Sequence, residues 1–415
     1  MASLITKSQI WRPWTHMQTA LDPIEIVRGK GASLFSAENK RYLDGISSWW
    51  VNLHGHGHPQ LIAAIQRQAE TLEHTLLADF THTPAIELAE TLLNLLPGNM
   101  KWIFYSDNGS TAVETALKIA LQYWHNENPN TPRTRIVSFK GSYFGETFGA
   151  MSAAGKNCYN TPFWKHMFPI DQIDPPYFGR EENAYRELKA ILQNNQTACM
   201  IFEPSILGAG GMRPYSSEGL DKLIGLCKEH QVLTIADEVM TGFGRTGPLF
   251  ASDRLRNTPD LICVAKGLTG GTLPLAATAC TEALFERFVS SNPAHSLMHG
   301  HSYTGNPIAC SAALASLDLL TSSLCQEQRN RIANRHVAFR DQFKTHPALK
   351  RIESLGTILI LESYIQKPNL SKDLLKQGIL LRPLGNVLYV MPPYCITDDE
   401  LSEIYEALIS TLELL

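Results

Sequence analysis

Residues 259–274 read PDLICVAKGLTGGTLP, and this stretch decides how the chain is interpreted. Residues 261–265 form a short apolar run, which predicts a buried β-strand. Lys266 stands where that strand ends, and glycines follow it closely. A lysine at a buried strand end is desolvated, which lowers the pKa of its amine and frees the amine to attack a carbonyl group. A surface lysine that opens a loop has the same local pattern, so this stretch alone leaves both interpretations open.

The composition indicates a globular protein that acts on small molecules. The 415 residues are 44% hydrophobic and 18% charged, with a formal net charge of -4, which is ample for a core. The absence of any run of Lys and Arg argues against nucleic acid or an anionic membrane as a partner. The eight cysteines are scattered and include no C-x-x-C pair. We therefore expect neither a disulfide framework nor a zinc knuckle, and we expect reduced thiols in the cytoplasm.

Targeting and membrane signals are also absent from the sequence pattern. Residues 1–14 contain one lysine and no sustained apolar core, which is not the layout of a signal peptide. No run of 18 apolar residues occurs, so no membrane-spanning helix is predicted.

Short apolar runs alternate with stretches of helical periodicity. The predicted strands are 102–105, 135–139, 198–202, 232–236 and 261–265, and the predicted helices include 61–75, 84–96 and 219–230. Residues 32–44 predict a peripheral hairpin. The alternation predicts an α/β fold with a mainly parallel sheet, whose ligands bind at the carboxyl ends of the strands.

The loop after the strand 102–105 has the features of a phosphate site. It reads SDNGST, and Thr111 and Glu114 have the spacing of a capping box that opens a helix. The amides of Gly109, Ser110 and Thr111 then lie at the positive end of the helix dipole, which favours an anion. A capped helix without a ligand has much the same sequence pattern, so this loop alone does not establish a phosphate site.

The literal G-x-G-x-x-G at 242–247 is not a dinucleotide site. Such a loop must follow a strand directly and open into a helix, with an acidic residue at the next strand end. Here Pro248 follows the last glycine and no helical period begins. We therefore do not expect a nicotinamide cofactor.

An aspartate at the end of the strand 232–236 gives Lys266 a chemical context. Asp237 precedes Lys266 by 29 residues, and Tyr143 lies in a glycine-flanked loop after the strand 135–139. A pyridoxal phosphate site needs a lysine that forms a Schiff base and an aspartate that keeps the pyridine nitrogen protonated. A helix-capping aspartate beside an unrelated lysine would not explain the phosphate-type loop or the stacking candidate Tyr143, so we favour the cofactor site.

Two features between residues 47 and 59 remain open. Adjacent tryptophans, Trp49 and Trp50, suit either a core anchor or a ligand wall. The alternating His54, His56 and His58 could be metal ligands, but the interleaved glycines and the closing proline favour a turn. No metal site is expected.

With these residues in place, the sequence resembles the class III aminotransferases of the pyridoxal phosphate fold type I superfamily over nearly its whole length. Within that class it is most similar to the biotin-pathway branch, which acts on 8-amino-7-oxononanoate. Met240 stands where ornithine- and GABA-type relatives usually carry glutamine. The stretches that carry the resemblance are WRPWT (11–15), SWW (48–50), QYW (122–124), GAGGMR (208–213), TGFGRTG (241–247), KGLTGG (266–271), RPLG (382–385) and MPPY (391–394).

The resemblance implies a domain division and a cofactor site. A large cofactor-binding domain spans 46–315, and a small α+β domain combines 1–45 with 316–415. Lys266 bonds to pyridoxal 5'-phosphate and later moves a proton, while Asp237 holds the ring nitrogen. The remaining implied cofactor contacts are phosphate contacts by Gly109 and Ser110, ring contacts by Tyr143 and Val239, and a phosphate contact by Ser302 of a second subunit. A homodimer with the active site at the interface is therefore implied.

The resemblance also implies substrate contacts. Arg382 holds the substrate carboxylate by its planar fork, and the long acyl chain is walled by Trp49, Trp50 and Tyr389. Further contacts are implied for Arg245 and Gly300, and for Trp14, which replaces the tyrosine common in the family and has no acceptor oxygen for a substrate amine.

The implied reaction is ping-pong transamination that converts 8-amino-7-oxononanoate to 7,8-diaminononanoate, with S-adenosylmethionine as the expected amino donor. The segment 299–306, HGHSYTGN, differs from the H-G-P-T form of S-adenosylmethionine users and resembles relatives thought to use lysine. Lysine as donor and another class III ω-aminotransferase activity are therefore the alternatives.

Overall fold

The predicted strands assemble into one seven-stranded sheet in the computed structural model, which describes residues 9–20 and 22–413. Residues 1–8, which belong to the stretch examined for a signal peptide, lie outside the described part. The strand order is β4-β12-β11-β10-β7-β5-β6. The strands are β4 (Met100–Ser106), β5 (Arg135–Phe139), β6 (Asp171–Ile173), β7 (Thr197–Phe202), β10 (Leu233–Asp237), β11 (Leu261–Val264) and β12 (Ala276–Thr281).

The sheet is mainly parallel, as the sequence predicts. β11, β10, β7, β5 and β6 pair in parallel, whereas β12 is antiparallel to both of its neighbours. The five predicted strands are confirmed, each with bounds within about two residues. The sequence reading missed β6 and β12, because β6 is only three residues long and β12 consists of small residues without a period of two.

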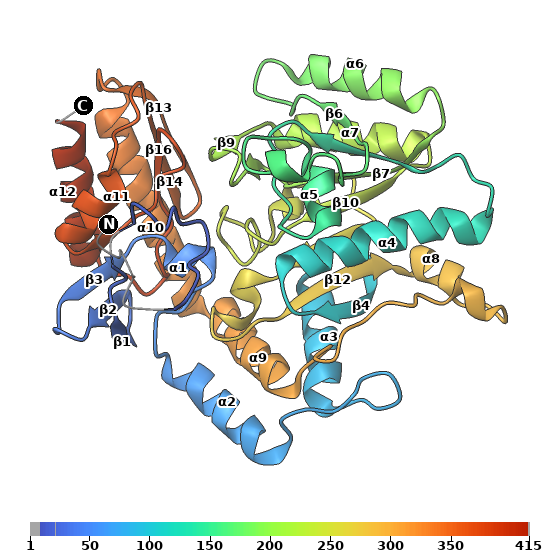
Figure 1. The fold of residues 1–415 in the computed structure, drawn as a ribbon, viewed down its shortest axis with the longest axis horizontal. Coiled ribbons are helices and arrows are strands. Elements are labelled where there is room, and N and C mark those ends of the chain that lie inside the picture. Colours follow the sequence, from blue (N-terminus) through green and yellow to red (C-terminus); the bar gives the residue numbers. More distant parts are fainter. Residues whose placement is uncertain (1–8, 21, 414–415) are drawn as a thin grey trace.

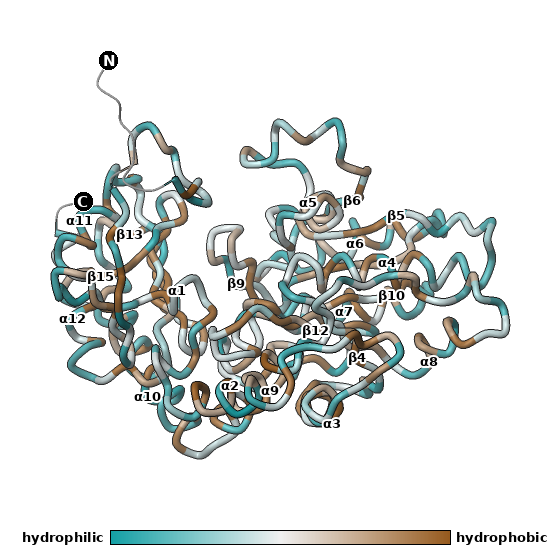
Figure 2. The backbone as a smooth tube through the Cα atoms, turned by 60° about the horizontal axis from the view of Figure 1, so that its bottom comes forward, coloured by the Kyte–Doolittle hydropathy of each residue, from teal (hydrophilic) through white to brown (hydrophobic). Residues whose placement is uncertain are grey.

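Helices cover both faces of this sheet (Figure 1). Residues of β7 alternate between two apolar clusters, with Met200 and Phe202 in one and Cys199 and Ile201 in the other. A strand buried on both faces reads as a continuous apolar run, which is why β7 was recognisable. Brown apolar segments accordingly concentrate in the strands of the sheet in Figure 2. The helices around it are α3 (Thr83–Leu95), α4 (Gly109–Glu127), α5 (Phe148–Ala154), α6 (Glu181–Leu192), α7 (Ser217–Glu229) and α8 (Glu282–Phe285).

The N-terminal and C-terminal segments of the described chain meet in a second group of elements. β15 (Ile379–Leu380) pairs in parallel with β3 (Arg41–Asp44), so the C-terminal third extends the N-terminal sheet. The predicted hairpin is confirmed by the antiparallel pair β2 (Ser33–Ser36) and β3. The other elements here are β1 (Ile26–Lys30), β13 (Leu349–Leu355), β14 (Ile358–Ser363), β16 (Val387–Val390), α10 (Ser323–Phe343), α11 (Leu370–Lys376) and α12 (Asp398–Leu412).

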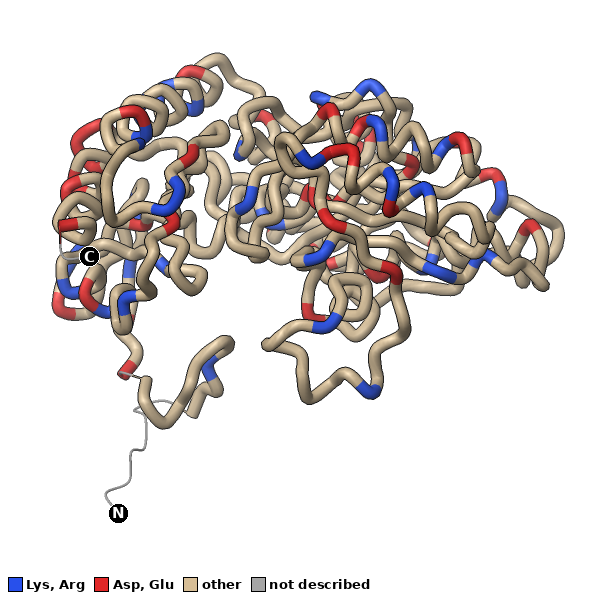
Figure 3. Tube along the Cα trace, turned by 90° about the horizontal axis from the view of Figure 1, so that it is seen from above, with Lys and Arg blue, Asp and Glu red and all other residues tan. Residues whose placement is uncertain are grey.

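Two helices lie between these groups. α2 (Pro59–Thr71) packs against α9 (Pro307–Thr321), and α9 also contacts α3 and the turn that begins at Lys266. Lys and Arg positions (blue) are interspersed with Asp and Glu positions (red) along the trace of the described residues in Figure 3. Within the described ranges no single helix is long and apolar enough to span a membrane; α9 and α10 pass that test only as a pair bent by 67°.

Candidate active site

A cavity of about 290 Å³ lies where the parallel strands end. This volume is at the lower end of the range for small-molecule sites, roughly 300–1,000 Å³. Every residue predicted to hold the cofactor lines it except Ser302. The lining residues are Trp50, Asn108, Gly109, Ser110, Tyr143, Phe144, Gly145, Glu203, Asp237, Val239, Met240 and Lys266.

Helix α4 begins at the cavity, but its cap differs from the prediction. Asn108 has extended backbone and caps the helix: its side chain accepts from the Thr111 amide at 3.1 Å, and the Thr111 hydroxyl accepts from the Asn108 amide at 3.2 Å. The capping box predicted at Thr111 and Glu114 is therefore wrong, because Asn108 satisfies the first amides one turn earlier. The Glu114 carboxylate accepts from the Gly149 amide at 2.6 Å instead.

Close backbone packing shapes the start of α4 into a cradle. A Cβ atom at Gly109 would lie 2.7 Å from Val239 Cγ1, and one at Gly145 would collide with Ser110. The Ser110 hydroxyl accepts from the Glu146 amide at 3.0 Å, which fixes its position. Helix amides, a hydroxyl and open space at glycines suit a phosphate group.

Asp237 is buried at the end of β10 beside this cradle. Its Oδ1 accepts from the Val239 amide at 2.9 Å. Burial raises the pKa of Asp237 to about 7, and the Val239 amide and the Lys266 charge oppose that shift. A cation placed against this carboxylate would keep it ionised, so the site suits a protonated pyridine nitrogen.

Lys266 follows β11 with a positive φ of 46°. Its Nζ lies 4.6 Å from the centroid of the Trp50 ring. Burial lowers the pKa of Lys266, and the carboxylates of Asp237 and Glu203 partly restore it. Across residues 9–20 and 22–413 the amine has neither a hydrogen bond nor an ion pair, so it is available to react. The residues present therefore fit pyridoxal phosphate: a phosphate cradle, a buried carboxylate and an unpaired amine share one cavity.

Glu203 is a site residue that the sequence reading missed. It is buried at the end of β7, and its carboxylate accepts from the amides of Tyr143 at 3.1 Å and Gly208 at 2.9 Å. Burial raises its pKa to about 8, and the charge of Asp237 adds to the shift. Glu203 therefore anchors the loop that carries Tyr143. An acidic residue at a buried strand end, the pattern that identified Asp237, was the available signal.

An arginine and two tryptophans form a second group near the cavity, which we call the mouth (Trp14, Trp49, Arg382). Arg382 donates from Nη2 to the Trp14 carbonyl at 3.0 Å, and its guanidinium lies 4.6 Å from the centre of the Trp49 ring. Trp49 is 36% exposed and Trp14 is 47% exposed. Arg382 makes no ion pair within the described chain, so its charge is available to an incoming carboxylate. The Trp14 ring meets Tyr159 edge-on at 5.5 Å.

Trp50 connects the cavity to the core of the second group of elements. Its Nε1 donates to the Tyr389 hydroxyl at 3.0 Å, and both side chains are buried. Trp49 and Trp50 lie in α1 (Ser47–Trp50), where all four residues have positive φ: 51°, 46°, 74° and 75°. For residues other than glycine, this left-handed turn costs roughly 1–2 kcal/mol per residue.

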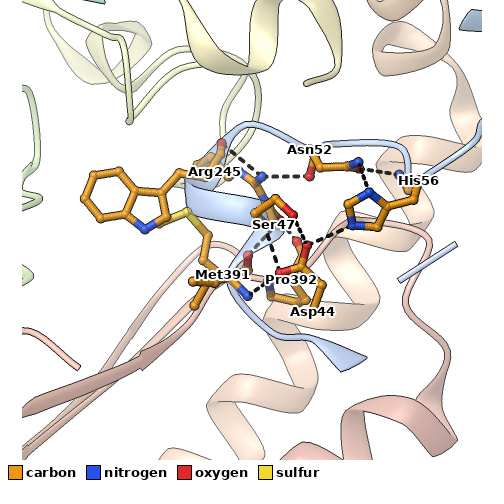
Figure 4. Close-up of polar contacts among 11 residues, drawn as sticks. Asp44, Ser47, Asn52, His56, Arg245, Met391 and Pro392 are labelled. Atoms are coloured by element: carbon orange, nitrogen blue, oxygen red, sulfur yellow. Dashed lines mark hydrogen bonds and ion pairs between the residues drawn. The ribbon is translucent and has the colours of Figure 1, made fainter. Parts of the chain in front are cut away.

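Arg245 lies behind this turn and is 1% exposed. It donates to the carbonyls of Pro392 at 2.8 Å, Trp50 at 3.3 Å and Asn52 at 3.1 Å (Figure 4). It does not line the cavity. Arg245 therefore contacts the site indirectly, by a hydrogen bond to the backbone carbonyl of Trp50, which lines the cavity.

Gly300 and Ser302 are exposed and do not line the cavity of their own chain. In the same segment the His299 ring stacks on Phe104 of β4, with 5.7 Å between ring centroids. The predicted role of Ser302 requires a second subunit.

The three alternating histidines have different hydrogen-bond partners, although the rings of His54 and His58 meet edge-on with 6.2 Å between centroids. The His54 Nε2 lies 3.1 Å from the Ser316 hydroxyl, and burial lowers the pKa of His54 to about 3. His56 contacts Asp44, and His58 stands at the N-cap position of α2, where its side chain makes no cap hydrogen bond. In the part of the chain that the structure describes, no three His, Cys, Asp or Glu residues are grouped to hold a metal ion.

Comparisons with known proteins identify the family that the chain resembles. A sequence model of the family described as class-III aminotransferase matches residues 16–412. An adenosylmethionine-8-amino-7-oxononanoate aminotransferase from Synechococcus elongatus is 45% identical over 420 residues, covering 97% of this chain and 98% of the relative. The crystal structure of the enzyme of that name from Methanocaldococcus jannaschii matches with a TM-score of 0.92 at 33% identity, covering 98% of this chain and 97% of the other. An amine transaminase from an uncultivated Pseudomonas species, in its pyridoxal phosphate-bound form, matches with a TM-score of 0.91 at 28% identity and covers 98% and 99%.

Proposed function

The chain belongs to the class III aminotransferase family, whose members depend on pyridoxal phosphate, and from this premise we propose that it converts 8-amino-7-oxononanoate to 7,8-diaminononanoate in biotin biosynthesis. S-adenosylmethionine is the proposed amino donor, as the names of the relatives from Synechococcus elongatus and Methanocaldococcus jannaschii support. The observation that carries the proposal is that a cavity lined by Lys266, Asp237 and the start of α4 adjoins the mouth through α1, where Trp50 of the cavity lining follows Trp49 of the mouth.

We assign the cofactor contacts to the cavity residues. Gly109 and Ser110 would hold the phosphate at the start of α4, and Asp237 would hold the ring nitrogen. Tyr143 and Val239 would contact the ring. When bound, pyridoxal phosphate supplies an aldehyde that exchanges amines and a ring that accepts the electron pair left when a proton leaves the substrate carbon.

Two side chains then act on protons. Lys266 has an amine whose lowered pKa leaves it able to accept a proton from the substrate carbon and return it. Asp237 is buried, and its carboxylate keeps a proton on a ring nitrogen placed against it. Glu203 holds the loop of Tyr143 against this pair through the Tyr143 amide.

The mouth matches a long acyl chain that ends in a carboxylate. Arg382 is the cation for that carboxylate, and it is already oriented by the Trp14 carbonyl and the Trp49 ring. Trp49, Trp50 and Tyr389 supply apolar surface for the methylene groups between the carboxylate and the reacting amine. Arg245 acts on the substrate through Trp50, whose carbonyl it holds.

The assembly and location are further parts of the proposal. We infer a homodimer in which Gly300 and Ser302 of one subunit complete the site of the other, because both are exposed and neither lines the cavity of its own chain. The division into 46–315 and 1–45 with 316–415 is supported by the β3–β15 pairing, which joins the two outer segments. A cytoplasmic location is supported by the free state of all eight cysteines.

Purified protein loaded with pyridoxal phosphate and given 8-amino-7-oxononanoate tests the reaction. With S-adenosylmethionine we expect 7,8-diaminononanoate by mass spectrometry, and the visible band of the bound cofactor should bleach when the donor is added alone. A parallel arm with lysine identifies the other donor, and a panel of ω-amines tests other class III activities. Protein that binds no cofactor, or that turns over ω-amines but not 8-amino-7-oxononanoate, would contradict the proposal.

A further inference from the structure

The left-handed turn at α1 has an unfavourable backbone conformation, so other contacts must stabilise it. One carboxylate accepts three of the hydrogen bonds that do so. Four successive non-glycine residues with positive φ rarely occur, because each side chain crowds its own carbonyl. The turn closes on itself through bonds from the Trp50 amide to the Ile46 carbonyl at 2.8 Å and from the Val51 amide to the Ser47 carbonyl at 3.0 Å. These bonds exist equally in a right-handed turn, so they do not select the hand.

Asp44 accepts hydrogen bonds from the backbone and a side chain of this turn. Its side chain is fully buried at the end of β3. Oδ1 accepts from the amides of Ile46 at 3.3 Å and Ser48 at 2.9 Å, and Oδ2 accepts from the Ser48 hydroxyl at 2.7 Å. The three donors come from both sides of the first residue of the turn, so the carboxylate ties its backbone to β3.

A chain of hydrogen bonds fixes the remaining contact of Asp44. The Gly55 amide can only donate, so the Asn52 atom that it meets at 2.7 Å is the oxygen. The Asn52 nitrogen then donates to Nδ1 of His56 at 3.2 Å. His56 Nδ1 is therefore an acceptor, and Nε2 carries the proton that it donates to Asp44 Oδ2 at 2.9 Å. Asp44 thus accepts four hydrogen bonds (Figure 4).

On its other side, the turn is stabilised by hydrogen bonds to backbone carbonyl groups. The Ser47 hydroxyl donates to the Met391 carbonyl at 2.8 Å, and Arg245 holds the carbonyls of Trp50 and Asn52. The turn is therefore clamped between β3 and the segment after β16. Its two tryptophans point to the two functional groups: the Trp50 ring lies 4.6 Å from Lys266 Nζ, and the Trp49 ring 4.6 Å from the Arg382 guanidinium.

We propose that Asp44 is a positioning residue that holds residues 47–50 in the left-handed turn and thereby sets Trp49 and Trp50 against the alkyl chain of the substrate. The substrate part rests on the proposed function, whereas the clamp itself does not. Any relaxation to negative φ would turn both indole rings away from their present positions, because the side-chain direction follows the backbone.

Three variants and a matched control test the clamp in cofactor-free protein. Asp44→Ala removes both acceptor oxygens and with them all four hydrogen bonds, and Asp44→Asn keeps the Oδ1 acceptor but not the Oδ2 acceptor. Asp44→Ala with Ser48→Gly adds a residue that adopts positive φ without a steric cost. The control is Asp221→Ala in α7, because Asp221 is also buried and also accepts from two backbone amides, those of Arg256 and Asn257.

Hydrogen exchange measured by mass spectrometry tests directly whether Asp44 stabilises the backbone of the turn. We expect peptides covering 45–53 to exchange faster in Asp44→Ala, less so in Asp44→Asn, and to slow again when Ser48→Gly is added. Asp221→Ala should lower overall stability without changing exchange in this segment. Wild-type exchange at 45–53 in Asp44→Ala, or no recovery from Ser48→Gly, would overturn the clamp.

Calorimetric titration with nonanoate measures the affinity of the mouth for an alkyl chain that ends in a carboxylate. We expect Asp44→Ala to bind nonanoate at least about tenfold more weakly than wild type, and the double variant to regain most of that loss. Unchanged nonanoate affinity in Asp44→Ala would overturn the link from the turn to the substrate. If wild-type protein itself does not bind nonanoate, the proposed substrate fails, while the exchange measurement still decides the clamp.

Discussion

The two ends of the site are built differently. The cofactor end uses strand ends of one sheet, and its acids are buried and hydrogen bonded to nearby amides, as with Asp237 and Glu203. The mouth combines segments far apart in the chain, around Trp14, Trp49 and Arg382, and its tryptophans are partly exposed. Chemistry common to both half-reactions therefore lies in the sheet, while substrate selection lies where the two parts of the chain meet. Changes at the first end should affect every substrate, and changes at the second only some.

Lys266→Ala should have the largest effect of any single change. It removes both the amine that bonds to the cofactor and the group that moves the substrate proton, so turnover should fall by at least about 10⁴-fold in both half-reactions. Stopped-flow absorbance with each substrate alone measures the two half-reactions. Lys140→Ala is the matched control, because Lys140 is exposed and its amine pairs with Asp174. Normal turnover in Lys266→Ala would show that the chemistry lies elsewhere.

The same contrast explains what the sequence could predict. Strand-end residues such as Asp237 and Lys266 are encoded locally: a short apolar run predicts the strand, and the polar residue that follows it lies at the carboxyl edge of the sheet. Parallel pairing then brings these ends together without further information. The α/β class and the cofactor end were accordingly accessible from the residues alone, although the cap of α4 was misplaced by one turn.

The mouth was accessible only through the family resemblance. Nothing local in the sequence indicates that Arg382 lies over Trp49, because that contact depends on how the C-terminal third packs on the N-terminal segment. The left-handed turn at Ser47–Trp50 runs against local propensity, since none of its residues is glycine. Its cause is Asp44, whose contacts to Ser48 and His56 depend on tertiary structure.

Arg382→Ala should have an intermediate effect that separates the two half-reactions. Loss of the only cation at the described mouth removes the partner of the substrate carboxylate, so kcat/KM for 8-amino-7-oxononanoate should fall by about 10²-fold. The donor half-reaction should change much less. Single-turnover kinetics of each half-reaction measures this ratio, and Arg382→Lys should recover only part of it because lysine lacks the planar fork.

An equal loss of activity in both half-reactions of Arg382→Ala would contradict the assignment of substrate selection to the mouth. It would mean that the arginine holds the structure of the mouth, through the Trp14 carbonyl and the Trp49 ring, more than it holds a carboxylate. Circular dichroism and thermal unfolding of the variant separate these causes, because a structural role lowers the melting temperature.

Glu203→Gln should have the smallest effect, confined to the pH dependence of stability in cofactor-free protein. The folded state raises the pKa of Glu203 to about 8, mainly by burial, whereas an unfolded chain has a glutamate near 4.3. The folded protein thus binds the proton more tightly, so this stabilisation is complete below about pH 4 and is lost as pH rises to about 8. Glutamine cannot ionise, so the melting temperature of wild type relative to Glu203→Gln should decline between pH 5 and 8, by on the order of 1–3 °C. The exposed Glu218→Gln is the control. If the melting temperatures of wild type and Glu203→Gln instead change in parallel with pH across this range, Glu203 is ionised throughout. The neighbouring groups at the cofactor end would then stabilise its buried charge.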